Sequence, residues 1–145
     1  MNPTIPSIAA REAEVIAEFQ LADGDWELET ELLIDQGNLL EPMDPALKTE
    51  ATRVHGCVSQ VWLHARLEEG RMHLWADSDS HLTKGIIALL IRVLNFQKPA
   101  DIVQTELRFI KKIGLKHLLT SQRQGGLAAM VKKINAEASR YTPNA

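Results

Sequence analysis

The sequence predicts an α+β fold in which a small antiparallel sheet of about three strands packs with several helices. Apolar residues recur with a helical period in the first 40 residues and again from residue 81, but with a period of two over 60–76. The helices therefore flank one sheet on both sides in sequence. They do not alternate with single strands, as they would in an α/β protein.

The chain has 145 residues, of which 45% are hydrophobic and 24% are charged. This length suits one domain, 1–145, with residues 1–7 as a loose tail, and the composition is globular rather than disordered. The N-terminus has neither a cationic start nor an apolar run of signal-peptide length, so we expect a cytoplasmic protein. The apolar run 85–91 ends at Arg92, well short of the roughly 20 residues of a membrane span, which favours a core helix.

Two acidic helices are predicted first. A helix capped by Ser7 precedes a break at 23–24, and Asp25 caps a second helix over about 26–36. Gly37 is expected as a left-handed C-terminal cap. The apolar positions of the two helices are Ile8, Val15, Ile16, Phe19, Leu32 and Leu33.

A β-hairpin is predicted in the middle of the chain. After a Pro-containing connector and a further short helix at 46–52, apolar and polar residues alternate over 60–67. A Glu-Glu-Gly turn follows, and the alternation resumes over 71–76 as the return strand. A third, shorter strand is expected at 52–54, reversing at 55–57, so that the sheet has three strands.

Helices fill the rest of the chain. A central helix begins after Ser80 or Asp79, either of which would cap it, and is expected to lie on the sheet. The chain restarts at 98–101, another helix stops at Gly114, and a last one begins near Thr120. The expected apolar positions are Leu82, Ile86, Leu89, Leu90, Val93 and Leu94, then Leu107, Ile110 and Ile113, then Leu127, Met130, Val131 and Ile134.

Charge is distributed unevenly along the chain. Residues 1–50 hold 2 basic and 12 acidic residues, 51–100 hold 6 and 4, and 101–145 hold 8 and 3, for a net charge of −3. This split describes either ordinary solvated faces or surfaces that steer a charged protein partner. Nucleic acid is disfavoured as a partner, because few aromatic residues and no binding motif accompany the basic ones.

Cys57 is the only cysteine. It excludes an intramolecular disulfide, a cysteine-only zinc site and a Cys-x-x-Cys redox pair. A lone cysteine is commonly a small buried hydrophobe. Three features favour a reactive thiol instead: a turn position, the adjacent Gly56 that leaves the sulfur open to approach, and positive charge from His55 and Arg53 that would favour the thiolate.

The residues around the thiol belong to a longer pattern. The stretch 53–63, Arg-Val-His-Gly-Cys-Val-Ser-Gln-Val-Trp-Leu, resembles the sulfur-acceptor motif of the SufE family, the cysteine desulfuration proteins of iron–sulfur cluster assembly. Further segments match in the same order: 77–79 with 84–85, 99–103, 114–115, 119–123 and 126–130. The resemblance covers 19–134 and implies a SufE/IscU-like fold. The single cysteine separates this chain from the IscU scaffold, which uses several to hold a cluster.

The resemblance implies a sulfur carrier. Cys57 would be the persulfide acceptor, taking sulfur from a PLP-dependent cysteine desulfurase, stimulating that enzyme and passing the sulfur to the cluster scaffold. By the same resemblance Asp79 and Arg123 support the cysteine loop or the transfer, with Gly56 and His55 beside the thiol. For these two the alternatives are a plain helix cap at Asp79 and a surface salt bridge at Arg123. No bound cofactor or metal is implied, because the PLP belongs to the desulfurase.

The implied partners are a SufS-like desulfurase and a SufBCD-like scaffold, with no nucleic acid and no membrane, and the protein would be a monomer or weak homodimer. It would be an accessory sulfur-transfer protein rather than a stand-alone enzyme. Residues 59–60 resemble SufE rather than its paralogue CsdE, although a CsdE-type acceptor for another desulfurase remains an alternative. The stretches 26–34 and 39–45 depart from the family pattern. These departures bear on how a partner docks and do not affect the chemistry of the thiol.

Three other functions remain open. One is a Cys–His hydrolase or thiol peroxidase, with Cys57 as nucleophile and a histidine as base. Another is a metal-binding module that combines the cysteine with histidines, and a third is a binding adaptor with an inert thiol. The histidines concerned are His55, His64, His73, His81 and His117.

Overall fold

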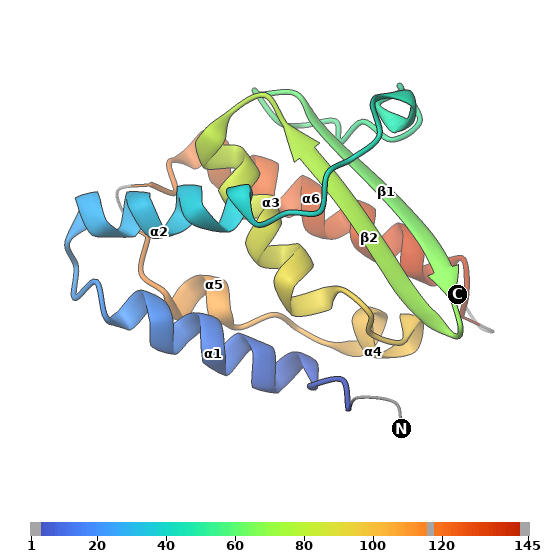
Figure 1. Cartoon of the computed structure of the whole chain (residues 1–145), viewed down its shortest axis with the longest axis horizontal. Helices are drawn as coiled ribbons and strands as arrows, with labels where there is room; N and C mark the ends of the chain where they lie inside the picture. The colour runs from blue at the N-terminus through green and yellow to red at the C-terminus, as the bar shows by residue number, and fades with distance from the viewer. Residues whose placement is uncertain (1–3, 116–117, 143–145) are drawn as a thin grey trace.

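A two-stranded hairpin and the helices around it make up the fold. The structure is a computed structural model that describes residues 4–115 and 118–142 (Figure 1). Within these ranges the elements are α1 (Ile8–Gln20), α2 (Trp26–Asn38), a 3₁₀ turn η1 (Pro45–Leu47), β1 (Val61–Glu68), β2 (Arg71–Ser78), α3 (His81–Leu94), α4 (Pro99–Gln104), α5 (Phe109–Lys112) and α6 (Ser121–Ser139). The predicted α+β class is confirmed. No described helix has the length and apolar character needed to cross a membrane.

The sheet has two strands in the described part of the chain, not the three expected. β1 and β2 pair antiparallel, with Val61 opposite Ser78 and Glu68 opposite Arg71. The segment expected as a third strand forms only one bridge to β1, between Arg53 and Trp62. It turns away at Gly56, whose φ is +99°, before a longer ladder can form.

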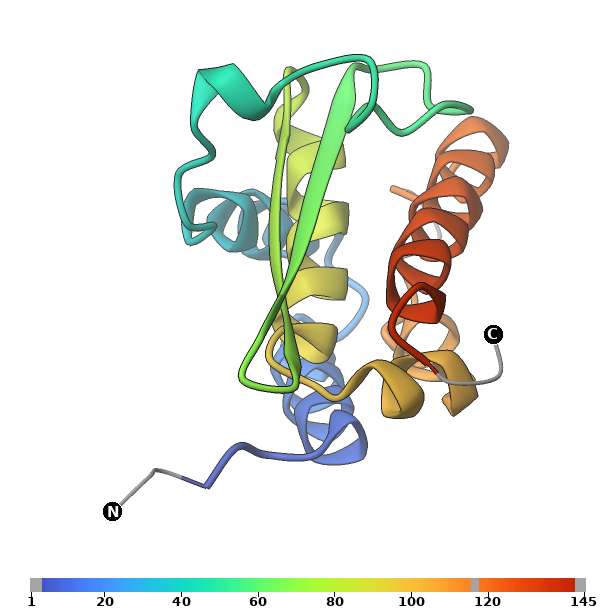
Figure 2. The ribbon, with the colours of Figure 1, turned by 90° about the vertical axis from the view of Figure 1, so that its right-hand side faces the viewer.

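Helix α3 occupies the centre of the molecule. It packs against β2 on one side and against α1, α2 and α6 on the others, while α6 also runs beside β1 (Figures 1 and 2). Ser80 is its N-cap, since the Ser80 hydroxyl accepts the Thr83 N–H at 3.3 Å. Between Ile86 and Leu94 nearly every α3 side chain is buried. A helix that is apolar almost all round must be enclosed in this way.

Gly37 has a different role from the expected one. It lies inside α2, which continues to Asn38, and it is not a left-handed cap. A Cβ at Gly37 would lie 3.1 Å from the backbone nitrogen of Gly85, and a Cβ at Gly85 would clash with the backbone carbonyl of Leu33. The two glycines therefore allow the backbones of α2 and α3 to approach closely.

Two predicted helices are shorter than expected. The 46–52 segment contains only the end of η1, which Asp44 caps. The helix expected through Leu107 begins at Phe109, because the buried Glu12 carboxylate accepts the N–H groups of Arg108 and Phe109 at 2.6 and 2.9 Å. That contact spans nearly 100 residues and leaves no local signal.

Helix α5 ends before Gly114, and the sequence predicted this end. Gly114 has φ +71°, as is typical of the residue that follows a helix C-terminus.

The N-terminal end of the described chain is partly held in place. The Pro6 carbonyl accepts a hydrogen bond from the buried Gln97 side chain at 2.7 Å, so part of the expected loose tail touches the core. Residues 1–3 of that tail lie outside the described residues.

Candidate functional site

Cys57 lies in the loop that joins the Arg53 bridge to β1. This loop reaches across from the hairpin to the N-terminal half of α6 (Figure 2). There the Cys57 Sγ lies 3.5 Å from the carbonyl oxygen of Gly126, close enough for the thiol to donate a weak hydrogen bond. The side chain is half-buried, whereas the next residue, Val58, is 78% exposed. The thiol is therefore held against the protein by a loop whose tip is in solvent.

An open cavity of about 490 Å³ adjoins the thiol. It lies where the Cys57 loop meets the N-terminal ends of α3 and α6. Hydroxyl groups from all three segments line it, over an apolar floor formed by Ile86 and Met130. The remaining lining residues are Cys57, Val58, Ser59, Ser80, Thr83, Thr120, Ser121, Gln122, Arg123 and Gly126. A group carried by the sulfur has room here without a change in the core.

Asp79 fastens the β1 end of the cysteine loop. The Gln60 N–H donates to Asp79 Oδ1 at 3.0 Å, and the Asp79 N–H donates to the Gln60 carbonyl at 3.2 Å. The Thr83 hydroxyl donates to the Ser59 hydroxyl at 3.4 Å. Asp79, expected as a possible helix cap or a support of the loop, holds the loop, while Ser80 caps the helix.

Arg123 lines the same cavity from the first turn of α6. The Arg123 side-chain Nη1 donates to the Leu118 carbonyl at 2.9 Å, and the Arg123 backbone N–H donates to the Thr120 hydroxyl at 3.4 Å. The guanidinium is thus held by the segment just before α6, and Arg123 and Cys57 line the same cavity. It does not form the surface salt bridge that was considered for it, within the described part of the chain.

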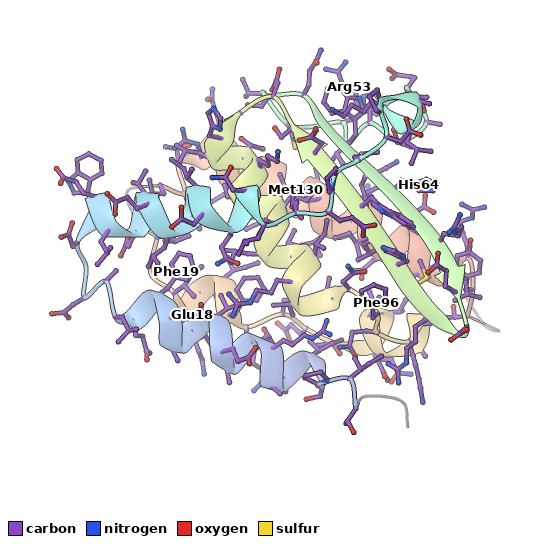
Figure 3. All side chains as sticks on the ribbon, in the orientation of Figure 1. Glu18, Phe19, Arg53, His64, Phe96 and Met130 are labelled. Atoms are coloured by element: carbon purple, nitrogen blue, oxygen red, sulfur yellow. The ribbon has the colours of Figure 1, made fainter. Side chains whose placement is uncertain are left out.

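Burial, and not a charge on His55 or Arg53, sets the direction in which the pKa of the Cys57 thiol is shifted. His55 Nε2 lies 2.9 Å from Glu50 Oε1, and both side chains are mostly exposed. Arg53 lies near η1 (Figure 3), and its backbone forms the bridge to Trp62. Burial raises the pKa of the Cys57 thiol above its ordinary value. The two cations were expected to lower the thiol pKa, and the shift of the half-buried thiol is in the opposite direction.

None of the other described histidines lines the cavity beside the thiol. His64 is on β1 (Figure 3), and His73 on β2 bridges Glu68 and Glu41 at 3.0 and 2.8 Å. His81 is exposed at the start of α3, and His117 is outside the described residues. Over 4–115 and 118–142 no three His, Cys, Asp or Glu side chains are grouped as metal ligands would be.

Two contributors to the site were missed from sequence alone: Gly126 and the Ser59–Thr83 pair. Gly126 has a signal in the sequence, because it follows Gly125 inside a predicted helix. Two adjacent glycines there cost about 1 kcal/mol each relative to alanine, so at least one is expected to have a packing reason. The Ser59–Thr83 contact joins a loop to a distant helix and has no sequence signal.

The sequence matches the SufE family, described as an Fe-S metabolism associated domain, over residues 13–138. The chain belongs to the SufE family. An uncharacterized SufE-like protein of Synechocystis sp. is 38% identical over 140 residues, covering 97% of this chain and 86% of that one. Another from Rhizobium meliloti is 32% identical over 135 residues, covering 90% and 96%.

A plant relative agrees with this SufE assignment, and a solved structure has the same fold. SufE-like protein 1, chloroplastic/mitochondrial, of Arabidopsis thaliana is 39% identical over 109 residues, which are 74% of this chain and 29% of that one. The solution structure of a hypothetical protein from Thermus thermophilus superimposes with a TM-score of 0.74 at 23% identity, covering 90% and 94% of the two chains. The expected resemblance and the SufE-like fold are confirmed, and the family places this chain in Fe-S metabolism.

Proposed function

We propose that this SufE protein is a sulfur acceptor and carrier, with Cys57 as the residue that holds the sulfur. It takes persulfide sulfur from a SufS-like, PLP-dependent cysteine desulfurase, stimulates that enzyme and delivers the sulfur to a SufBCD-like scaffold in the cytoplasm. One observation carries the proposal: the sole cysteine of the chain stands at the wall of an open cavity, on a loop with an exposed tip.

The proposed transfer exchanges one S–S bond for another. The Cys57 thiolate attacks the outer sulfur of the persulfide on the desulfurase, a new S–S bond forms, and the donor's S–S bond breaks. The donor cysteine leaves as a thiolate, which takes up a proton, and Cys57 becomes the persulfide. No net oxidation occurs, so this step needs neither a metal nor an external oxidant or reductant.

The half-buried thiol suits a carrier that is inactive when alone. Burial disfavours the thiolate, and only the thiolate attacks sulfur efficiently. A donor that displaces the loop would therefore expose the thiol and raise its reactivity. Between the Arg53 bridge and the Gln60–Asp79 pair, the loop can move without disturbing either strand.

The absence of a second cysteine suits the same role. A second thiol near Cys57 would attack the persulfide and release its sulfur while forming an internal disulfide. This chain has no such residue. Sulfur held on Cys57 can therefore leave only to an external acceptor.

Intact-mass measurement tests the proposal. The protein is incubated with a SufS-type desulfurase and cysteine, then weighed under non-reducing conditions. We expect added sulfur on the wild type, none on Cys57→Ser, and faster alanine production by the desulfurase when the wild type is present. A wild type that stays unmodified beside an active desulfurase would refute the carrier role. A parallel incubation with a CsdA-type desulfurase distinguishes the SufE from the CsdE assignment by relative rate.

A further inference from the structure

One face of α6 contacts the cysteine loop at two points and the segment just before that loop at a third. Gly126 lies against Cys57, Ala129 lies under Gly56, and the Lys133 ammonium donates to the Ala51 carbonyl at 3.2 Å. Positions three, four and seven apart share one face of a helix, so this strip is continuous. The contacts are individually weak: a thiol–carbonyl contact, a van der Waals contact and one exposed hydrogen bond.

Gly126 makes the contact with the sulfur itself. A Cβ at this position would lie 3.2 Å from the Cys57 Sγ and 3.7 Å from its Cα and Cβ. Ordinary contacts between heavy atoms of this kind are about 3.5–4.0 Å, so a methyl group would displace the sulfur by a few tenths of an ångström or more. The carbonyl of the same residue faces the thiol at 3.5 Å. The missing side chain and the carbonyl together form the seat of the sulfur.

Gly125 provides the comparison within the same helix. A Cβ at Gly125 would have nothing within 4 Å. Both glycines are in α6 and neither has a positive φ, so both would gain helix propensity on replacement by alanine. Only Gly126 requires its hydrogen side chain for the cysteine loop to sit where it does.

We propose that Gly126 is a positioning residue for sulfur transfer: its open space and carbonyl hold Cys57 in the half-buried seat, and the size of residue 126 sets how readily the thiol is presented to a reagent or partner. The inference rests on the proposed function for its biological meaning, but its geometry does not depend on it. Gly126 is not a catalytic residue, because it acts through the position of Cys57.

A side chain at 126 would move the loop rather than the helix. The loop is anchored at one end by the Val54 N–H, which donates to the Val61 carbonyl at 2.8 Å, and at the other by the Gln60–Asp79 pair. Between these anchors Gly56 supplies the flexible backbone position. A displaced thiol is better solvated, so the burial that raises its pKa is reduced.

The test compares Gly126→Ala with Gly125→Ala and the wild type. Each protein is alkylated with iodoacetamide over a range of pH, and the rate at Cys57 is followed by intact mass. We expect Gly126→Ala to react at least about threefold faster near neutral pH, with its midpoint shifted to lower pH. That factor corresponds to about half a pKa unit. Gly125→Ala should match the wild type in both rate and midpoint.

A double-mutant cycle keeps the test valid if Gly126→Ala is unstable. If the cost of the methyl group comes from its contact with the sulfur, then Cys57→Ala should restore stability to Gly126→Ala and have no such effect in Gly125→Ala. Identical alkylation profiles for all three proteins, or no coupling between residues 57 and 126, would overturn the inference.

Both measurements use the purified chain without a desulfurase, so they stand even if the protein never accepts sulfur. If it does, Gly126→Ala should load at least as fast as the wild type and should release sulfur sooner to an added small thiol. Loading that fails in every variant while the alkylation difference persists would refute the carrier role alone.

Discussion

Asp79 and Gln60 are joined by two hydrogen bonds. The Gln60 N–H donates to the Asp79 carboxylate at 3.0 Å, and the Asp79 N–H donates to the Gln60 carbonyl at 3.2 Å. Gln60 is three residues after Cys57, and Asp79 directly precedes Ser80, the N-cap of α3. The pair of hydrogen bonds therefore fixes the point at which the cysteine loop ends and β1 begins.

Removing the Asp79 carboxylate should make the cysteine loop more mobile. In Asp79→Ala the Gln60 N–H loses its acceptor, and a net hydrogen bond of about 1 kcal/mol corresponds to roughly fivefold faster amide exchange. Hydrogen exchange followed by NMR measures this at Gln60 and in the residues before it. Asp79→Asn keeps a side-chain oxygen and should retain most of the protection. Equal exchange in Asp79→Ala and the wild type would mean that the pair does not anchor the loop.

The reactivity of Cys57 should rise at higher pH than that of an ordinary thiol. Burial raises its folded-state pKa, so the alkylation midpoint of the native protein should exceed that of the same protein in denaturant. The sign for stability follows: the seated neutral thiol stabilises the fold below the unfolded-state pKa, and this contribution is lost as pH rises through the folded-state value.

Unfolding measurements check that sign. The stability of the wild type relative to Cys57→Ala should decrease between about pH 7 and about pH 10. A native midpoint at or below the denatured one would show that the thiol is not held in its buried seat.

Asp77 should stabilise the protein at neutral pH and lose this effect in acid. Burial raises its pKa, but hydrogen bonds from Lys48 at 2.5 Å, the Ser78 N–H at 2.8 Å and Lys84 at 3.3 Å more than offset that, so the pKa is lowered overall. Stability from such a group is present above the unfolded-state pKa and is lost as pH falls through the folded-state value.

The comparison of Asp77→Asn with the wild type measures the effect. Denaturant unfolding should show a loss of about 1 kcal/mol at neutral pH, converging on the wild type near about pH 2–3. The exposed Asp35→Asn on α2 is the control and should change little at either pH. A constant difference across the whole range would place the effect in packing instead.

The closest approach of α2 and α3 should tolerate no side chain at Gly85. A methyl group there would clash with the Leu33 backbone carbonyl, which cannot move without moving α2. We expect Gly85→Ala to lower the unfolding free energy by at least about 3 kcal/mol. Gly125→Ala should leave it unchanged or raise it by up to about 1 kcal/mol. A Gly85→Ala protein as stable as the wild type would contradict the packing described.

Docking with the desulfurase should depend on salt if the uneven charge steers it. The acidic residues concentrate in the first 50 residues and the basic excess in the last 45. Exposed charges are screened over about 8–10 Å at physiological ionic strength, so the initial rate of sulfur loading should fall about tenfold between about 0.05 and 0.5 M KCl. A flat salt profile, with desulfurase activity on cysteine alone as the control, would show that the charge split has no part in docking.

Local signals accounted for most of the secondary structure. Ser7 and Asp25 cap the helices they were expected to cap, the last helix begins beside Thr120 as expected, and the alternating pattern predicted the hairpin. These features depend on neighbours within a few residues. The role of Gly37 and the start of α5 were wrong or missed, because a packed helix and the Glu12 carboxylate decide them from far along the chain.

The candidate site also divides into features with a local sequence signal and features that depend on distant contacts. The turn position of Cys57 was predicted, since glycine and the change of period mark it locally. Its seat was not, because Gly126 lies 69 residues away and meets the thiol only after α6 docks. His55 was misleading: it is two residues from Cys57 in sequence, but its side chain pairs with Glu50 and faces solvent. Nearness in sequence gave no guide to which charges surround the sulfur.

The separation between Cys57 and Gly126 also bears on how the protein is made. A ribosome synthesises Cys57 69 residues before Gly126, the residue of α6 that shelters it, so the nascent chain carries an unprotected thiol for several seconds at ordinary elongation rates. Oxidants and electrophiles can reach the sulfur most easily in that interval. A completed chain that has lost α6 from its place would return to the same exposed state, which makes alkylation of Cys57 a direct report on whether the C-terminal helix is docked.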